Sequence, residues 1–400
     1  MFHSIAREIA MTTLVSKWNY PTTVRFGAGR ISELPDALSA TGISNPLFVT
    51  DPGLASLPVV ASTLKILADA KVPYGVFSDV KPNPVESNLT AGIAAFKQGK
   101  HDGVIAFGGG SALDLGKLIA FQAGQTRPVW DFEDIGDWWT RADADAIVPI
   151  VAVPTTAGTG SEVGRAGVVT HEATHTKKVI FHPKMLPQIV IADPELTVGM
   201  PPFITAGTGM DALAHCLEAY CAPGYHPMAD GIAVEGVRLV LENLPKVFAN
   251  GSDLTARAHM MSAAAMGATA FQKGLGAIHS LSHPIGALYD THHGMTNAVF
   301  MPYVLANNRD AIEERIVRLA AYCGIEGGFD GFAATIRKLR ADLKVPNTLG
   351  GLIKDLAMDD ARKDLIAEMA IVDPTAGGNP IPLTKQMALD LLNKAISGEN

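Results

Sequence analysis

Residues 103–117 have the sequence GVIAFGGGSALDLGK, which combines an apolar run, three glycines and a run rich in alanine and leucine. The apolar run predicts a buried β-strand, and the residues after the glycines predict a helix. Glycines let a ligand approach the backbone, and the first turn of the helix offers unpaired N–H groups to a phosphate. A plain tight turn fits equally well, because the GxGxxG spacing and the acid that usually follows it are absent.

The same alternation of strand and helix extends on both sides of this segment. Helical stretches are predicted around residues 64–68 and from about residue 86 to 100. Further apolar strand-like runs lie at residues 47–51, 74–80, 147–156 and 188–194. Apolar strands without polar alternation, separated by helices, predict a mostly parallel sheet covered on both faces. Residues 167–181 predict an inserted hairpin with a polar turn.

After DPEL, at residues 193–196, the pattern changes to helical spacing almost to the end of the chain. Representative helical segments are residues 210–220, 230–244 and 254–271. Because 400 residues exceed one ordinary core, we predict two domains. The first is a Rossmann-like α/β domain of residues 1–196, and the second is an all-α domain of residues 197–400.

Composition excludes several classes of function. A net charge of −8 argues against binding to nucleic acid or to a cytoplasmic membrane surface. No apolar run is long enough to span a membrane, and residues 1–17 lack the long apolar core of an export signal, so a loose N-terminal extension is expected. The three cysteines form no CxxC pair, which favours a reducing cytoplasm and small core residues over a disulfide framework.

Two other segments are candidates for ligand binding at the ends of strands. PTTAGTGSEV, at residues 154–163, offers small residues and the hydroxyl groups of Thr155, Thr156 and Ser161. Asp51 ends an earlier strand, where a carboxylate can accept hydrogen bonds from a ribose and repel a 2′-phosphate. An aspartate that caps a turn is the competing interpretation for Asp51.

A metal site is predicted in the helical half. Asp211 and His215 have i,i+4 spacing, so their side chains share one helical face. Four of the 12 histidines lie within the apolar stretch of residues 277–300, and burying several imidazoles without partners is costly. A carboxylate with imidazoles selects a divalent first-row ion over calcium or magnesium.

Spacing alone leaves open which of these four histidines are ligands. His279 and His283 also have i,i+4 spacing, and Pro284 is expected to end the helix just after His283. His292 and His293 are adjacent, so they are expected to point in different directions.

These segments together resemble the iron-containing (group III) alcohol dehydrogenases from about Thr22 to beyond residue 390. The motifs that carry the resemblance are GGGSALDLGK (108–117), PTTAGTGSEV (154–163), DPEL (193–196), GMDALAHCLEAY (209–220) and HSLSHPIGALYDTHHG (279–294). The resemblance implies a dehydroquinate synthase-like fold and a metal held by Asp211, His215, His279 and His293. It implies that His283 is a catalytic or proton-relay residue. His292 stands where the family pattern has proline, which makes it a candidate for a second proton carrier or for an alternative ligand beside His293.

The resemblance also implies a set of NAD-binding residues. These are Asp51 and Asn83 on the adenosine side, Gly109, Gly110, Ser111 and Asp114 at the first glycine loop, Thr155, Thr156 and Ser161 at the second, and Lys177.

The expected activity is reversible hydride transfer between a small primary alcohol or diol and its aldehyde, with NAD and Fe²⁺ or Zn²⁺ as cofactors. A homo-oligomer in the cytoplasm is expected. The alternatives are a dehydroquinate-synthase-like or glycerol-dehydrogenase-like member of the same fold acting on a polyol or cyclic substrate, and a metal-binding protein without catalysis.

Overall fold

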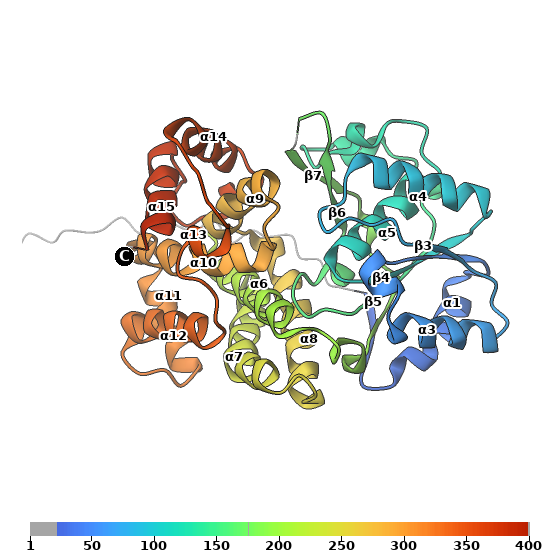
Figure 1. Ribbon diagram of the computed structural model, residues 1–400, viewed down its shortest axis with the longest axis horizontal. Coiled ribbons are helices and arrows are strands. Elements are labelled where there is room, and N and C mark those ends of the chain that lie inside the picture. The colour runs from blue at the N-terminus through green and yellow to red at the C-terminus, as the bar shows by residue number, and fades with distance from the viewer. Residues whose placement is uncertain (1–21, 175, 399–400) are drawn as a thin grey trace, which may run out of the picture.

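A computed structural model of the chain describes residues 22–174 and 176–398. The expected N-terminal extension lies outside these residues. The protein has two lobes, an α/β lobe built from the first half of the chain and a helical lobe built from the second (Figure 1).

The α/β lobe is organised around a six-stranded parallel sheet with the order β1-β8-β5-β4-β2-β3. Its strands are β1 (Thr23–Phe26), β2 (Pro46–Val49), β3 (Gly75–Phe77), β4 (Gly103–Gly108), β5 (Ile150–Pro154) and β8 (Ile189–Ala192). The helices of this lobe are α1 (Leu34–Thr41), α2 (Pro52–Ala55), α3 (Pro58–Asp69), α4 (Glu86–Gln98) and α5 (Gly110–Gln122). The prediction of a mostly parallel sheet is confirmed, although the sequence analysis did not identify the edge strand β1.

Both faces of the sheet are covered, which explains why its central strands are apolar at every position. On β4, Ile105 and Phe107 face a core shared with α1 and α3. Val104 and Ala106 face the opposite core, which includes residues of α4 and α5 and continues into the helical lobe. All six residues of β4 are buried, so successive side chains enter different cores without reaching water.

The helical lobe contains no strand among its described residues, as the sequence pattern predicted. Its helices are α6 (Pro202–Cys221), α7 (Pro227–Ala249), α8 (Leu254–Ala270), α9 (Ala277–Tyr289), α10 (His293–Asn307), α11 (Arg309–Tyr322), α12 (Gly328–Asp342), α13 (Leu349–Leu352), α14 (Asp360–Ile371) and α15 (Lys385–Ser397). A Rossmann-like sheet domain followed by helices is therefore the observed fold class.

The prediction that the helix ends at Pro284 is wrong. Helix α9 continues through this proline to Tyr289. The proline removes one backbone N–H, but residues on both sides of it, from Ala277 to Ser282 and at Ile285 and Gly286, are buried against neighbouring helices. Tertiary packing therefore keeps the segment helical in spite of the missing hydrogen bond.

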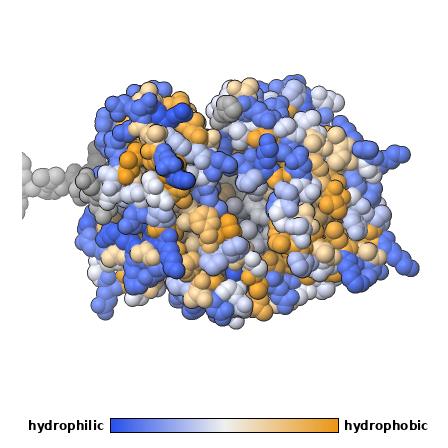
Figure 2. Space-filling model, in the orientation of Figure 1, coloured by the Kyte–Doolittle hydropathy of each residue, from blue (hydrophilic) through white to orange (hydrophobic). Residues whose placement is uncertain are grey.

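The contacts between the lobes include the loop after β5 and a hairpin. The loop after β5 packs onto α8, where a Cβ at Gly160 would lie 2.3 Å from the Cβ of Ala268. The predicted hairpin is present as the antiparallel pair β6 (Ala166–His171) and β7 (Thr176–Phe181), and β7 contacts α9. Figure 2 shows the surface hollowed along the line where the two lobes meet. No helix among the described residues has both the length and the apolar character needed to cross a membrane.

Close packing of α5 on β4 gives a test of this fold. A Cβ at Gly116 would lie 2.7 Å from the Cβ of Ala106, so the helix must move away to accept it. We expect Gly116→Ala to destabilise the protein by about 1–3 kcal/mol, measured as a lower midpoint of denaturation. Gly199→Ala is the matched control, because a Cβ there meets no atom within 4 Å. Equal midpoints for the two variants would contradict the close contact.

Candidate metal and cofactor site

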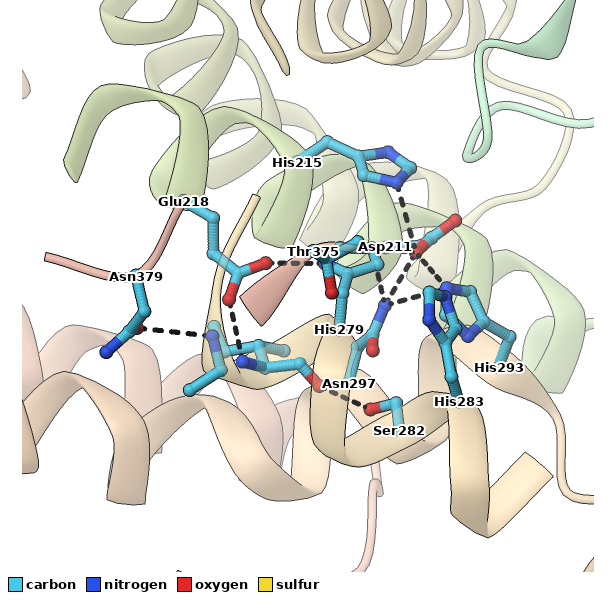
Figure 3. A network of polar contacts seen from close by, with 12 residues as sticks. Asp211, His215, Glu218, His279, Ser282, His283, His293, Asn297, Thr375 and Asn379 are labelled. Atoms are coloured by element: carbon cyan, nitrogen blue, oxygen red, sulfur yellow. Dashed lines mark hydrogen bonds and ion pairs between the residues drawn. The ribbon is translucent and has the colours of Figure 1, made fainter. Parts of the chain in front are cut away.

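Four side chains of the kinds that bind metals converge from three helices (Figure 3). Asp211 and His215 project from α6, His279 from α9, and His293 is the first residue of α10. The carboxylate Oδ1 of Asp211 lies 3.8 Å from His215 Nε2, 3.7 Å from His279 Nε2 and 3.4 Å from His293 Nε2. Asp211, His215 and His279 are buried, and their ligand atoms lie within 4.8 Å of one another.

These separations fit a divalent ion. Two ligand atoms that each lie about 2.1 Å from a tetrahedrally coordinated ion are about 3.4 Å apart. The Nδ2 of Asn297 lies 2.8 Å from Asp211 Oδ1 and 3.2 Å from the Nε2 atoms of His279 and His293. An amide has two hydrogens and can donate to at most two of these three atoms. Asn297 alone therefore cannot satisfy all three acceptor atoms, whereas a cation could be bound by all of them.

The protonation states of the clustered side chains also favour the binding of a cation. Burial lowers the pKa of His215 to about 4 even though Asp211 is near, and burial holds the pKa of His293 well below its ordinary value. Burial by itself would raise the pKa of Asp211, but the surrounding imidazoles lower it. Near neutral pH Asp211 is therefore ionised while His215 and His293 are neutral, and these are the forms that bind metals.

Glu218, which the sequence pattern did not single out, lies behind the cluster. One oxygen of its carboxylate is 2.5 Å from Nδ1 of His279, and the other accepts a hydrogen bond from the backbone N–H of Ile278 at 2.7 Å. Burial disfavours the charged form of His279, yet the carboxylates of Glu218 and Asp211 raise its pKa to about 9. Its spacing from Asp211 and His215, at i+7 and i+3, places Glu218 on the same face of α6 and could have identified it.

His283 lies beside the four ligand-type residues without contacting Asp211. Its ring stacks on that of His293, with centroids 5.3 Å apart, and meets the ring of His279 edge-on at 5.9 Å. Its Nδ1 is 2.8 Å from the Oδ2 of Asp373, another residue that the sequence analysis missed. His283 and Asp373 are 90 residues apart, so no local spacing signals this pair.

His292 and its neighbour His293 have different ring contacts. It precedes the first residue of α10, and its ring lies edge-on to Phe203 with centroids 5.6 Å apart. A Cβ at Gly207 would lie 2.5 Å from the Cε1 of His292, so this ring packs against the first half of α6.

The two predicted glycine loops lie against one another. Gly109 precedes the first residue of α5, and Gly110 and Ser111 begin the helix. A Cβ at Gly110 would lie 2.6 Å from the Cγ2 of Thr159 in the second loop. The backbone N–H of Thr155 donates to the carbonyl of Gly108 at 3.0 Å.

Side chains tie the two loops together. The hydroxyl of Ser161 donates to Asp114, which also accepts from the N–H of Val168 at 3.1 Å. Near these loops, a Cβ at Gly109 would lie 3.2 Å from the Cγ2 of Thr156. Two loops held together at the start of a helix, whose first N–H groups have no partner within the helix, are the kind of structure that holds a pyrophosphate.

The three remaining predicted cofactor residues differ in their surroundings. Asp51 accepts a hydrogen bond from the N–H of Leu54 at 2.9 Å and caps α2. Asn83 donates to Asp290, at the end of α9, at 2.7 Å. Lys177 on β7 faces α9, where a Cβ at Gly286 would lie 3.6 Å from its Nζ. Burial lowers the pKa of Lys177 despite the nearby carboxylates of Asp114, Asp290 and Asp373.

Comparisons with known proteins place this arrangement in a family. Residues 21–194 match the model described as iron-containing alcohol dehydrogenase, and residues 205–396 match the model of the C-terminal part of the same family. The 4-hydroxybutyrate dehydrogenase of Cupriavidus necator is 36% identical over 371 residues, covering 90% of this chain and 94% of that protein.

Solved structures agree with these sequence matches. A crystal structure of 1,3-propanediol oxidoreductase superposes with a TM-score of 0.89 at 34% identity, covering 95% of this chain and 100% of the other. Sulfoacetaldehyde reductase from Bifidobacterium kashiwanohense, solved with NAD⁺, gives a TM-score of 0.86 at 28% identity, covering 96% and 99%.

The fold and the clustered side chains thus define an oxidoreductase of the two-lobed α/β-and-helical class. The chain belongs to the iron-containing alcohol dehydrogenase family, whose enzymes act on CH–OH groups.

Glu162, beside the second glycine loop, gives a pH-dependent prediction. Burial raises the pKa of its carboxyl group from 4.5 to about 7, against the opposing effect of the nearby Lys117. Because the folded chain keeps this proton to a higher pH than the unfolded chain, the contribution to stability is present below about pH 4.5 and is lost as the pH rises through about 7. Relative to Glu162→Gln, the wild-type protein should therefore lose about 1–3 kcal/mol of stability between pH 5 and pH 8.

Denaturation midpoints of both proteins at the two pH values measure this difference. Glu314→Gln, at an exposed position of α11, is the control and should follow the wild type at both pH values. A constant difference between wild type and Glu162→Gln across the range would contradict the raised pKa.

Proposed function

We propose that this protein catalyses the NAD-linked, metal-dependent interconversion of a small primary alcohol or diol and its aldehyde. The observation that carries the proposal is the convergence of Asp211, His215, His279 and His293 in the helical lobe, beside a second lobe with two paired glycine loops. The proposal includes a division into an α/β domain of residues 1–196 and a helical domain of residues 197–400. Support for that division comes from the two family models, which end at residue 194 and begin at residue 205.

Asp211, His215, His279 and His293 are the proposed ligands of a divalent ion, Fe²⁺ or Zn²⁺. The family name supports iron, whereas the usual order of affinities for nitrogen and oxygen ligands favours zinc. When bound, the ion supplies a Lewis acid for the substrate oxygen, and NAD supplies the hydride acceptor. Glu218 orients His279 by accepting a hydrogen bond from its Nδ1–H, which leaves Nε2 on the side of Asp211, where it would bind the ion.

NAD is assigned to the paired loops. Gly109, Gly110 and Ser111 would receive the pyrophosphate, with Asp114, Thr155, Thr156 and Ser161 holding the second loop against the first. Asp51 and Asn83 are assigned to the adenosine side, and Lys177 to the nicotinamide side. The NAD⁺ complex of the sulfoacetaldehyde reductase supports this cofactor, and the carboxylate of Asp51 would repel the 2′-phosphate of NADP.

His283 is the proposed proton carrier. Its ring stacks on the ring of His293 and is a quarter exposed, so it borders both the cluster and the solvent. During alcohol oxidation its Nε2 would accept the hydroxyl proton, and during aldehyde reduction it would return that proton.

A small, weakly charged substrate fits better than an acidic cyclic one. Residues 277–293, which bring three of these histidines to the site, include no lysine or arginine. A lyase acting on a phosphorylated acid needs several cations, which disfavours the dehydroquinate-synthase-like alternative. A metal-binding protein without catalysis would leave the two paired glycine loops unexplained. A homo-oligomer in the cytoplasm completes the proposal.

The ligand assignment predicts a specific loss of metal. We expect His279→Ala to lower bound iron or zinc at least tenfold and to abolish turnover, because one ligand and the link to Glu218 are both lost. Metal content after dialysis, measured by mass spectrometry, is the readout. His259 is an exposed histidine of α8, so His259→Ala is the matched control. This variant should keep the full metal content. Full metal content and activity in His279→Ala would refute the assignment.

The reaction itself is tested by NAD reduction. Protein loaded anaerobically with Fe²⁺ or with Zn²⁺ is expected to reduce NAD with at least one member of a panel of primary alcohols, α,ω-diols and ω-hydroxy acids. NADH absorbance measures the reaction, with NADP in parallel, where at least tenfold lower kcat/KM is expected. Absence of NADH formation with both metals and every alcohol would overturn the proposal.

A further inference from the structure

We propose that Asp373 is a positioning residue that fixes the tautomer of His283, so that Nε2 of this histidine is free to accept a proton. This role of Asp373 rests on the proposed function, in which His283 carries the proton. The tautomer of His283 can be observed independently of that function. Asp373 lies in the connection between α14 and α15, far in sequence from the metal cluster.

The two oxygens of the Asp373 carboxylate have different partners. Oδ1 accepts hydrogen bonds from the backbone N–H of Thr375 at 2.9 Å and from its hydroxyl at 2.6 Å. Oδ2 lies 2.8 Å from the Nδ1 of His283. The carboxylate is mostly enclosed, with 12% of its side chain exposed, so water competes little for these positions.

An ionised carboxylate can only accept hydrogen bonds, so Nδ1 of a neutral His283 must carry the proton. Nε2, on the other side of the ring, then has the free lone pair. Burial by itself would raise the pKa of Asp373, but the imidazole of His283 and the hydrogen bonds from Thr375 have the larger, opposite effect. The pKa of Asp373 is therefore lowered, which keeps its carboxylate ionised. The geometry thus imposes the tautomer that a proton acceptor facing an alcohol requires.

The N–H and hydroxyl of Thr375, which donate to Asp373, determine how an asparagine at position 373 would be oriented. In Asp373→Asn, the backbone N–H of Thr375 still requires an acceptor at the Oδ1 position. The amide oxygen therefore stays beside Thr375, and the NH₂ group takes the position that faces Nδ1 of His283. Because NH₂ is a donor, it pairs with an unprotonated Nδ1 and moves the proton of the ring to Nε2. The isosteric variant is thus expected to present the wrong tautomer to the substrate.

Comparison of Asp373→Asn with Asp373→Ala separates this role from simple packing. Both variants remove one negative charge near Lys177, so the change in charge cancels in the comparison. Alanine leaves Nδ1 free to adopt either tautomer, whereas asparagine enforces the wrong one. We expect kcat for alcohol oxidation to fall by roughly 10²-fold or more in Asp373→Asn and by roughly tenfold in Asp373→Ala, with KM nearly unchanged.

The tautomer is measured directly on zinc-loaded protein labelled with ¹⁵N-histidine, in which the His283 signals are assigned by their loss in His283→Gln. The expected result is a proton on Nδ1 in the wild type and on Nε2 in Asp373→Asn. A proton on Nε2 of the wild-type ring, or an Asp373→Asn variant more active than Asp373→Ala, would overturn the proposal. If the wild type shows the expected tautomer but reduces NAD with no alcohol, the proposed function fails and the positioning role of Asp373 stands.

Discussion

The buried carboxylate of Asp211 is the constraint around which the helical lobe is arranged. A charge with so little access to water is tolerated only if other groups compensate it. Three imidazoles and the amide of Asn297 surround one carboxylate oxygen within 3.8 Å, and they come from three different helices. Helices α6, α9 and α10 must therefore keep their relative positions, and the rest of the lobe packs around that arrangement.

The same requirement reaches the α/β lobe through close backbone contacts. Gly158 approaches Thr208 on α6, three residues before Asp211, so that a Cβ would lie 2.7 Å from its Cβ. Gly160 has a positive φ of 61° and approaches α8, which leaves no room for a side chain. The second glycine loop is thus held by the helix that carries Asp211 and His215. The small residues of this loop allow its backbone to pack closely on the helical lobe, and they also leave space for a ligand.

Much of this architecture could be predicted from local pattern, and the remainder depends on long-range contacts. The central strands are apolar throughout and are separated by segments of helical periodicity, and this pattern predicts a covered parallel sheet. The edge strand β1 is four residues long and mostly exposed, so it carries no comparable signal. Helix α9 passes through Pro284 because burial on both sides outweighs one lost hydrogen bond. The pairing of His283 with Asp373 spans 90 residues and leaves no periodic trace.

Two histidines of α9 show how similar local chemistry can serve different purposes. Both His279 and His283 have a carboxylate at Nδ1, from Glu218 and Asp373 respectively, so both present Nε2 on the opposite side of the ring. The side chain of His279 is only 2% exposed and its Nε2 faces Asp211, so its lone pair is available only to an enclosed ion. The side chain of His283 is 25% exposed, and among the residues that the structure describes only Asp373 has a carboxylate within ion-pair distance of it. Under the proposed function, one turn of helix therefore separates a lone pair that binds a metal from one that exchanges protons with solvent.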